Sequence, residues 1–441
     1  MDLALALIRR YFSMSNGTLY VGGIPVGTIA AKYGTPLFIY DSDVLHRKWT
    51  ILRNTYPPEF AISYSVKANP NQTILKYLLA KGCGLEVASG GEFYQAIRAG
   101  CPAEKIVYAG PGKTEAELEL VLTQGLGELH IESLGELERM RTISRRLGLQ
   151  ARVAVRVNPS PEAEGGAMRM GGKAAPFGID EENLDVVLDQ LLEDPALEFR
   201  GVHLFTGTQI LDHLVLISQY YHGLEIAKQV ASRVQRPLHT IDFGGGLGIP
   251  YFPNEQELNM AELRQSLTTL MAKAHGEALF SGTQFMVEPG RYLVGEAGIY
   301  VARITDIKVS RGKKFLIVDG GMNHHLAASG NLGLVIKRNF PVALLSQVDS
   351  PLEETVDIVG PLCTPLDVLA RATNLPKAEI GDLVGIFQSG GYARTASPLN
   401  FLSHPVPPEV WVEGGRDYLI RRRGKYGDYL QDQCFCDSSA G

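Results

Sequence analysis

The chain has 441 residues, of which 45% are hydrophobic and 20% are charged, and its formal net charge at pH 7 is −6. This composition is typical of a globular protein with room for two domains and large cores. The only concentrated basic run is Arg421-Arg422-Arg423, so we exclude nucleic acids and anionic membranes as partners and expect a small or local ligand.

The five cysteines show no metal-ligand spacing and are odd in number. This predicts a reducing compartment, and therefore a cytoplasmic protein without a disulfide framework or a metal site. Residues 1–12 carry Arg9 and Arg10 after their apolar residues and lack a cleavage-like site, so we expect neither a signal peptide nor a membrane span.

Short apolar runs alternate with helical patterns between residues 60 and 290. Eight β-then-α units in a stretch of this length favour the α/β class, as a (β/α)8 barrel rather than an open doubly wound sheet. The expected strands are 60–66, 85–87, 106–108, 129–131, 153–157, 202–204, 241–243 and 285–287.

After Arg291 the pattern changes to strands separated by Gly and Pro, which predicts an all-β domain. The expected strands are 299–307, 315–318, 355–359, 383–387 and 410–412, and the segment 18–40 is a source of further strands for this domain. We therefore expect a barrel domain over residues 41–295 and a β-rich domain formed by residues 1–40 and 296–441.

Lys67 is the first candidate for chemistry, because it ends the β-branched and aromatic run that precedes Asn69-Pro70. A lysine at the C-terminal mouth of a buried strand is partly desolvated, which makes its amine a nucleophile able to form a Schiff base with a carbonyl. The structural alternative is a strand-end lysine whose amine reaches into water.

Polar residues and glycines also mark the ends of most other expected strands. Because the active site of such a barrel lies at the C-terminal face, we expect them to lie together. Each residue taken alone also has a purely structural explanation. An arginine can form a surface ion pair, a histidine can be a hydrogen-bonded core residue, and a glycine run can form a tight turn. The residues are Glu86 and Ser89 at the second strand, Gly110 at the third, Arg156 at the fifth, His203 at the sixth, Gly244, Gly245 and Gly246 after the seventh, and Glu288 after the eighth.

The glycine run 244–246 lets several backbone N–H groups approach one anion, and a phosphate is the natural ligand for a loop after the seventh strand. Together with a carbonyl-reactive lysine, a phosphate site indicates pyridoxal 5′-phosphate. Glu288 beside the pyridine nitrogen would keep that nitrogen protonated, so that the ring accepts electrons, and His203 can stack on the ring.

Six motifs, in this order, resemble those of the fold-type III pyridoxal-phosphate decarboxylases of the diaminopimelate and ornithine type. The resemblance runs from about Thr35 to Phe401. It implies an alanine-racemase-like barrel with a β domain, and a head-to-tail homodimer with active sites at the interface. The motifs are 66–69 (VKAN), 87–92 (VASGGE), 244–246 (GGG), 288–291 (EPGR), 360–363 (GPLC) and 390–392 (GGY).

The resemblance also implies roles for individual residues. Lys67, His203, Glu288 and Cys363 would be catalytic, with Cys363 supplied by the partner subunit. The expected cofactor-binding residues are Lys67, Glu86, Arg156, His203, Thr206, Gly244, Gly245, Gly246, Glu288, Gly290, Arg291 and Tyr392. The expected substrate-binding residues are Arg291, Cys363, Thr364, Asp367 and Tyr392, and no metal is expected.

Two departures weaken a diaminopimelate assignment. The family usually has Cys-Glu-Ser where this chain has Cys363-Thr364-Pro365, and Ala327 stands where an arginine would grip the distal carboxylate. Two segments, Arg338–Pro341 and Cys363–Pro365, more closely resemble a subgroup that acts on carrier-protein-linked amino acids in specialised biosynthesis, such as the butirosin-pathway decarboxylase of a glutamyl thioester. They also resemble a decarboxylase-like group found beside exosortase systems. We therefore expect decarboxylation of a side-chain-modified or carrier-tethered amino acid.

Three alternatives remain open at this point. The first is a diaminopimelate decarboxylase that makes L-lysine. The second is an amino-acid racemase, although racemases of this fold place arginine at the pyridine nitrogen, where this chain offers Glu288. The third is a non-catalytic pyridoxal-phosphate-binding protein, although single-barrel carriers of that kind lack the second domain expected here.

Overall fold

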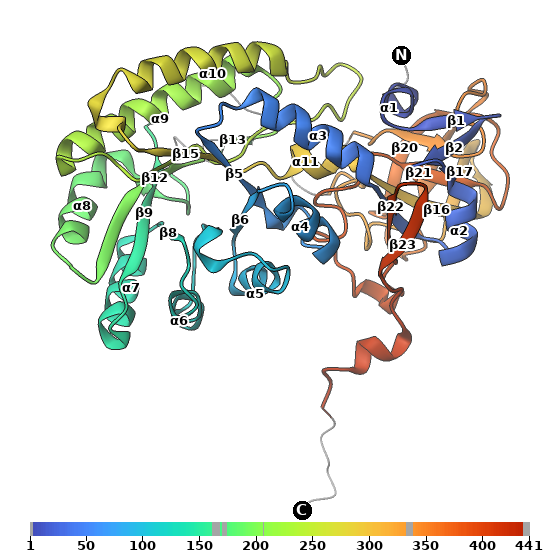
Figure 1. The fold of residues 1–441 in the computed structure, drawn as a ribbon. Helices are drawn as coiled ribbons and strands as arrows, with labels where there is room; N and C mark the ends of the chain where they lie inside the picture. Colours follow the sequence, from blue (N-terminus) through green and yellow to red (C-terminus); the bar gives the residue numbers. More distant parts are fainter. Residues whose placement is uncertain (1–2, 161–167, 170–173, 206, 332–337, 435–441) are drawn as a thin grey trace, which may run out of the picture. The chain divides into compact units, whose positions relative to one another are not determined.

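The computed structural model describes residues 3–160, 168–169, 174–205, 207–331 and 338–434 (Figure 1). The chain divides into two compact units. The barrel unit comprises Arg47–Pro250 and Gln256–Leu293, and the β-rich unit comprises Met1–His46, Tyr251–Glu255 and Val294–Gly441.

The barrel unit contains, among the residues described, eight parallel strands that close on themselves. Each strand pairs with the next one along the chain, and β15 pairs back to β5, with Met286 opposite Ala61. This closure confirms the predicted barrel. The strands are β5 (Phe60–Ser65), β6 (Gly84–Val87), β7 (Ile106–Tyr108), β8 (Glu128–Ile131), β9 (Ala151–Asn158), β12 (Leu197–Leu204), β14 (Thr240–Asp242) and β15 (Gln284–Val287).

Helices alternate with these strands and lie around them (Figure 1). Several begin at a Ser, Thr, Asn or Asp side chain that accepts a backbone N–H of the first turn, as Ser89 does from Glu92 at 3.1 Å. Ser89, at the second strand end, is thus a helix cap. The helices are α3 (Ser42–Thr55), α4 (Gln72–Leu79), α5 (Gly90–Arg98), α6 (Glu115–Thr123), α7 (Leu134–Leu147), α8 (Leu184–Leu192), α9 (His213–Val234), α10 (Met260–His275) and α11 (Arg291–Val294).

The β-rich unit joins both ends of the chain in one sheet. The N-terminal strand β4 runs antiparallel to β16, with Ile39 opposite Ile299, and parallel to β22, with Ile39 opposite Val410. The unit also holds helices α1 (Leu3–Tyr11) and α2 (Val26–Tyr33). Its strands are β1 (Ser13–Ser15), β2 (Thr18–Val21), β3 (Ile24–Pro25), β4 (Leu37–Asp41), β16 (Gly298–Ser310), β17 (Lys313–Val318), β18 (Val342–Leu344), β19 (Glu354–Val359), β20 (Val368–Leu375), β21 (Leu383–Ile386), β22 (Glu409–Glu413) and β23 (Arg416–Arg421).

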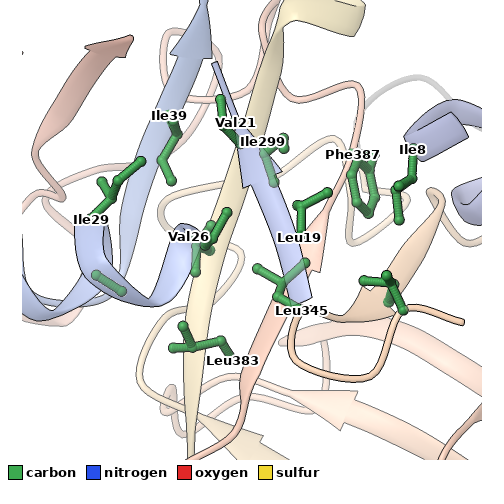
Figure 2. Packing of buried hydrophobic residues seen from close by; sticks show 14 of the residues in the cluster. Ile8, Leu19, Val21, Val26, Ile29, Ile39, Ile299, Leu345, Leu383 and Phe387 are labelled. Atoms are coloured by element: carbon green, nitrogen blue, oxygen red, sulfur yellow. The ribbon is translucent and has the colours of Figure 1, made fainter. Parts of the chain in front are cut away.

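Figure 2 shows the buried core of the β-rich unit. Ile8 and Leu19 come from the N-terminal part of the chain, and Ile299 and Phe387 come from the C-terminal part. All four side chains are buried, so burial of apolar surface holds the two ends of the chain together in this unit. Among the described residues, no helix is both long and apolar enough to cross a membrane.

Candidate active site

Lys67 lies in a short 3-10 helix, Val66–Ala68, directly after β5. Its Nζ lies 2.8 and 2.9 Å from the two carboxylate oxygens of Glu86, which also accepts a hydrogen bond from the Ser65 hydroxyl. The sequence predicts a desolvated amine here, whereas the Lys67 side chain is 43% exposed and Glu86 is buried. An ion pair with a fixed carboxylate, rather than an apolar pocket, therefore positions the amine.

Arg156, at the fifth strand, is held by Glu132, which follows β8. Arg156 Nη1 lies 2.7 Å from Glu132 Oε1, and the backbone N–H of Gly110 donates to the same carboxylate at 2.5 Å. Burial would raise the pKa of Glu132, but the charges of Arg156 and Lys113 outweigh burial and hold it below its ordinary value. The result is a fixed, buried ion pair that joins three neighbouring strand ends.

A second cluster lies on the strands of the barrel and combines two histidines with three carboxyl groups. The rings of His130 and His203 stack with their centroids 4.2 Å apart, and His203 Nε2 lies 3.4 Å from Glu288 Oε2. His130 Nε2 lies 3.1 Å from Glu128 and 4.0 Å from Asp242. All five side chains are buried.

Burial sets the charge of this cluster. It lowers the pKa of His203 well below the ordinary value, helped by the neighbouring His130 and Arg156, so His203 is neutral at pH 7. Burial also raises the pKa of Asp242 well above its ordinary value, together with the charge of Glu288. The neutral form of the Asp242 carboxyl group is therefore favoured beside Glu288.

Several polar atoms of this cluster have unused hydrogen-bonding capacity. In the part of the chain that the structure describes, neither ring nitrogen of His203 and neither Asp242 Oδ2 nor Glu288 Oε1 has a hydrogen-bond partner. Buried groups left in this state need an explanation, such as a ligand. One donor atom each of His130, His203, Asp242 and Glu288 also lies within 4.8 Å of the others, a spacing that would accept a divalent cation. The expectation of no metal stays a prediction.

The glycine run after β14 is required by close backbone packing. Gly244 has φ of +66°, and a Cβ there would lie 2.5 Å from the carbonyl oxygen of Leu204. A Cβ on Gly245 would lie 2.6 Å from the carbonyl oxygen of Glu288, whose N–H donates to Gly244 at 2.8 Å. The loop is thereby fixed directly beside Glu288, with Gly290 and Arg291 following in the next turn.

The other predicted residues lie in the β-rich unit, except Thr206, which lies outside the described residues. Cys363 is an exposed free thiol. Asp367 is buried, and its carboxylate accepts backbone N–H groups from Met322 at 2.7 Å and Leu362 at 2.9 Å. Thr364 accepts a hydrogen bond from the Leu366 N–H at 3.3 Å, and Tyr392 has a left-handed backbone with φ of +56°.

Sequence reasoning assigned no residue to the fourth strand, and so missed His130 and Glu132. It also missed Asp242, which ends the seventh strand. Two signals were present: Glu132 directly follows the apolar run 129–131, and the two-residue period of a strand puts Glu128, His130 and Glu132 on one side.

The barrel closes on itself and carries a lysine after its first strand, a glycine loop after its seventh and a carboxylate after its eighth. The sequence matches the family described as "Pyridoxal-dependent decarboxylase, pyridoxal binding domain" over residues 42–295. The chain belongs to this family and is a carboxy-lyase.

Individual relatives cover nearly the whole chain. An L-glutamyl-[BtrI acyl-carrier protein] decarboxylase of Niallia circulans is 35% identical over 94% of this chain and 97% of that protein. A diaminopimelate decarboxylase of Zymomonas mobilis is 33% identical over 96% of this chain and 98% of that protein. The crystal structure of diaminopimelate decarboxylase from M. jannaschii in complex with L-lysine superposes with a TM-score of 0.87, at 27% identity and covering 96% of this chain and 98% of that one.

Proposed function

We propose that the protein removes the α-carboxylate of an amino acid with pyridoxal 5′-phosphate as its cofactor. This cofactor, when bound, supplies an electron-accepting ring. The observation that carries the proposal is the buried Glu288, with an unused carboxylate oxygen, beside the neutral ring of His203. A cofactor ring between these residues could pair its protonated nitrogen with the Glu288 carboxylate and stack on the ring of His203.

Different residues of the barrel unit bind different parts of the cofactor. Lys67 attaches the cofactor, and Glu86 positions its amine beforehand. Glu288 holds a proton on the pyridine nitrogen, because a buried carboxylate stabilises a neighbouring cation. His203 covers one face of the ring, and the N–H groups of Gly245 and Gly246 bind the phosphate, since the N–H of Gly244 already donates to Asp242 at 2.8 Å. We infer that Arg156, Thr206, Gly290, Arg291 and Tyr392 complete the cofactor site.

We infer a homodimer in which residues 41–295 bind the cofactor, while residues 1–40 and 296–441 complete the active site of the partner subunit. Cys363 would then reach the substrate from the partner subunit as a catalytic thiol, beside Thr364 and Tyr392. The exposure of Cys363 within its own chain supports this arrangement. The paucity of cysteines supports a cytoplasmic location, and the acidic net charge supports a protein that binds neither nucleic acid nor membrane.

We infer a substrate whose far end is neutral, such as a glutamyl unit carried as a thioester on a carrier protein. Ala327 and Thr364 offer no charge for a distal carboxylate or ammonium group. The carboxylate of Asp367 is already bonded to two backbone N–H groups. His325 is buried, and burial lowers its pKa to about 3, so it is uncharged at pH 7. The relative that acts on an L-glutamyl carrier protein supports the same substrate class.

Diaminopimelate is the second candidate substrate, since several relatives are diaminopimelate decarboxylases. Release of carbon dioxide separates the two candidates. We expect the kcat/KM for free meso-diaminopimelate, lysine and ornithine to fall at least about a hundredfold below that for a glutamyl thioester, which is roughly 2.7 kcal/mol. Efficient turnover of free meso-diaminopimelate, with none of the thioester, would establish the second candidate.

A further inference from the structure

A pocket of about 520 Å³ lies in the β-rich unit, and none of the residues that line it has been given a catalytic, cofactor-binding or substrate-binding role above. Its volume lies within the range of about 300–1,000 Å³ that is usual for small-molecule sites. One wall is the segment 251–254, and the other walls come from 338–342 and 371–374. The first wall begins five residues after Gly246, so a short stretch of chain joins it to the glycine loop.

Two arginines give the pocket its positive charge. The guanidinium of Arg338 lies 4.9 Å from the ring centroid of Phe252, and both Arg338 and Arg371 are exposed. Among the described residues, no carboxylate forms an ion pair with either arginine. These two guanidinium groups therefore remain available to an anion.

Two hydrogen bonds join the segments that carry the two arginines. Asn339 donates to the carbonyl oxygen of Arg371 at 2.6 Å and accepts the Arg371 N–H at 2.8 Å. The next residue, Ala372, has a left-handed backbone with φ of +44°, and its N–H is held by Asp357 at 2.7 Å. Backbone strain of this kind persists where the surroundings enforce it, often at binding sites.

The rest of the pocket combines apolar residues with the amide and hydroxyl groups of Asn254, Asn339, Thr373 and Asn374. The rings of Tyr251 and Phe340 pack with their centroids 4.6 Å apart, and Leu352 at the rim is 54% exposed. The pocket thus offers two cations together with apolar surface and neutral polar groups. This combination suits a long, flexible ligand that carries one phosphate and otherwise consists of methylene, methyl and amide groups.

We propose that this pocket binds the phosphopantetheine arm of a carrier protein, with the phosphodiester at Arg338 and Arg371. This inference rests on the proposed carrier-tethered substrate and adds the site that recognises the tether. The phosphate and the thioester lie at opposite ends of the arm. A site that binds the phosphate must therefore lie outside the reaction centre, at a distance set by the length of the arm. A free amino acid has no group that could use the pocket.

The test compares two ligands that differ only in the phosphate, 4′-phosphopantetheine and pantetheine, by calorimetry on the cofactor-loaded enzyme. We expect the wild type to bind 4′-phosphopantetheine at least about tenfold more tightly. The double variant Arg338→Gln, Arg371→Gln should lose this preference, while the control Arg416→Gln, an exposed arginine on β23, should keep it. The glutamyl thioesters of the two arms should show the same pattern in KM, with kcat unchanged.

Equal affinity of the wild type for both ligands would overturn the proposal, as would a preference that survives in the double variant. Inorganic phosphate that binds as tightly as 4′-phosphopantetheine would also overturn it, because the pocket would then be a general anion site. If neither glutamyl thioester is decarboxylated, the proposal of a carrier-tethered substrate is wrong. The calorimetric comparison then still tests whether the pocket binds the phosphopantetheine arm.

Discussion

At the scale of a residue, the ion pair between Lys67 and Glu86 fixes the amine that we propose as the nucleophile. A lysine that is 43% exposed would ordinarily sample many rotamers, and the two contacts of 2.8 and 2.9 Å restrict it to one position. Glu86 is itself fixed by burial and by the Ser65 hydroxyl. The amine is thus held in one position, which would lower the entropic cost of the cofactor attachment that we propose.

We predict that Lys67 is the attachment point. Borohydride treatment of the purified protein should fix the cofactor onto one peptide, and peptide mapping should place it at Lys67. The variant Lys67→Ala should lose the visible absorbance, whereas Lys76→Ala, at an exposed position of α4, should retain it. A reduced cofactor on any other lysine would refute the assignment.

His130 packs against His203, the residue that we propose covers the cofactor ring. Its ring stacks on His203 at 4.2 Å, and the carboxylate of Glu128 at 3.1 Å holds its orientation. We predict that His130→Asn weakens cofactor binding about three- to tenfold, because an aromatic pair contributes about 0.5–1.5 kcal/mol. Cofactor titration followed by circular dichroism in the visible range measures this, with the exposed His275→Asn as the control. An unchanged affinity for the cofactor would show that His130 does not help His203 to bind it.

At the scale of elements, the barrel strands were predictable from sequence because both faces of each are buried. The strand β6, for example, is a run of apolar residues around Glu86, and its position was predicted within one residue. The strands β20 and β23 were missed. In β20 the central residues are exposed and two register shifts interrupt its pairing with β19, so neither alternation nor a continuous apolar run marks it.

The candidate site was only partly predictable for a related reason. Residues that follow a strand, such as Lys67 and Glu288, stand at a boundary that hydrophobicity reveals. His130 lies within β8 and Asp242 ends β14, and hydrophobicity alone does not distinguish such a polar residue from an interruption of the apolar run. Glu86, Arg156 and His203 also lie in strands, and they were predicted from their place towards the C-terminal face of the barrel. Whether His130 and Asp242 belong to the site depends on which side chains meet inside the barrel. That can be known only from the register of neighbouring strands, for example His130 opposite Ala154.

The loop after β17 makes the β-rich unit sensitive to acid. Burial lowers the pKa of both His324 and His325 to about 3. Between about pH 6.5 and pH 3 the unfolded chain binds protons that the folded chain does not, so stability falls as the pH falls through this window. We predict that the urea midpoint of unfolding decreases from pH 7 to pH 4.5, and that the decrease is smaller in His325→Gln than in the exposed control His46→Asn. Equal decreases in the two variants would contradict the role of His325.

At the scale of the whole molecule, the inferred dimer makes each active site depend on two chains. We predict that Lys67→Ala and Cys363→Ala proteins, each inactive alone, recover activity when mixed. Random exchange makes half of the dimers mixed, and one of the two sites in each is then wild type, so up to about a quarter of the activity should return. Lys67→Ala mixed with itself is the control. No recovery, with exchange verified by labelled subunits, would place Cys363 and Lys67 in the same chain.

The central claim is that Glu288 makes this barrel a decarboxylase by holding a proton at the cofactor ring. The most direct measurement is substrate-dependent release of carbon dioxide by Glu288→Gln, which keeps the size of the side chain and removes its charge. We predict that the variant binds the cofactor, with its visible absorbance retained, while kcat falls at least about a hundredfold, the loss expected when an electrostatic contribution to the transition state is removed. Carbon dioxide release at the wild-type rate would contradict the account.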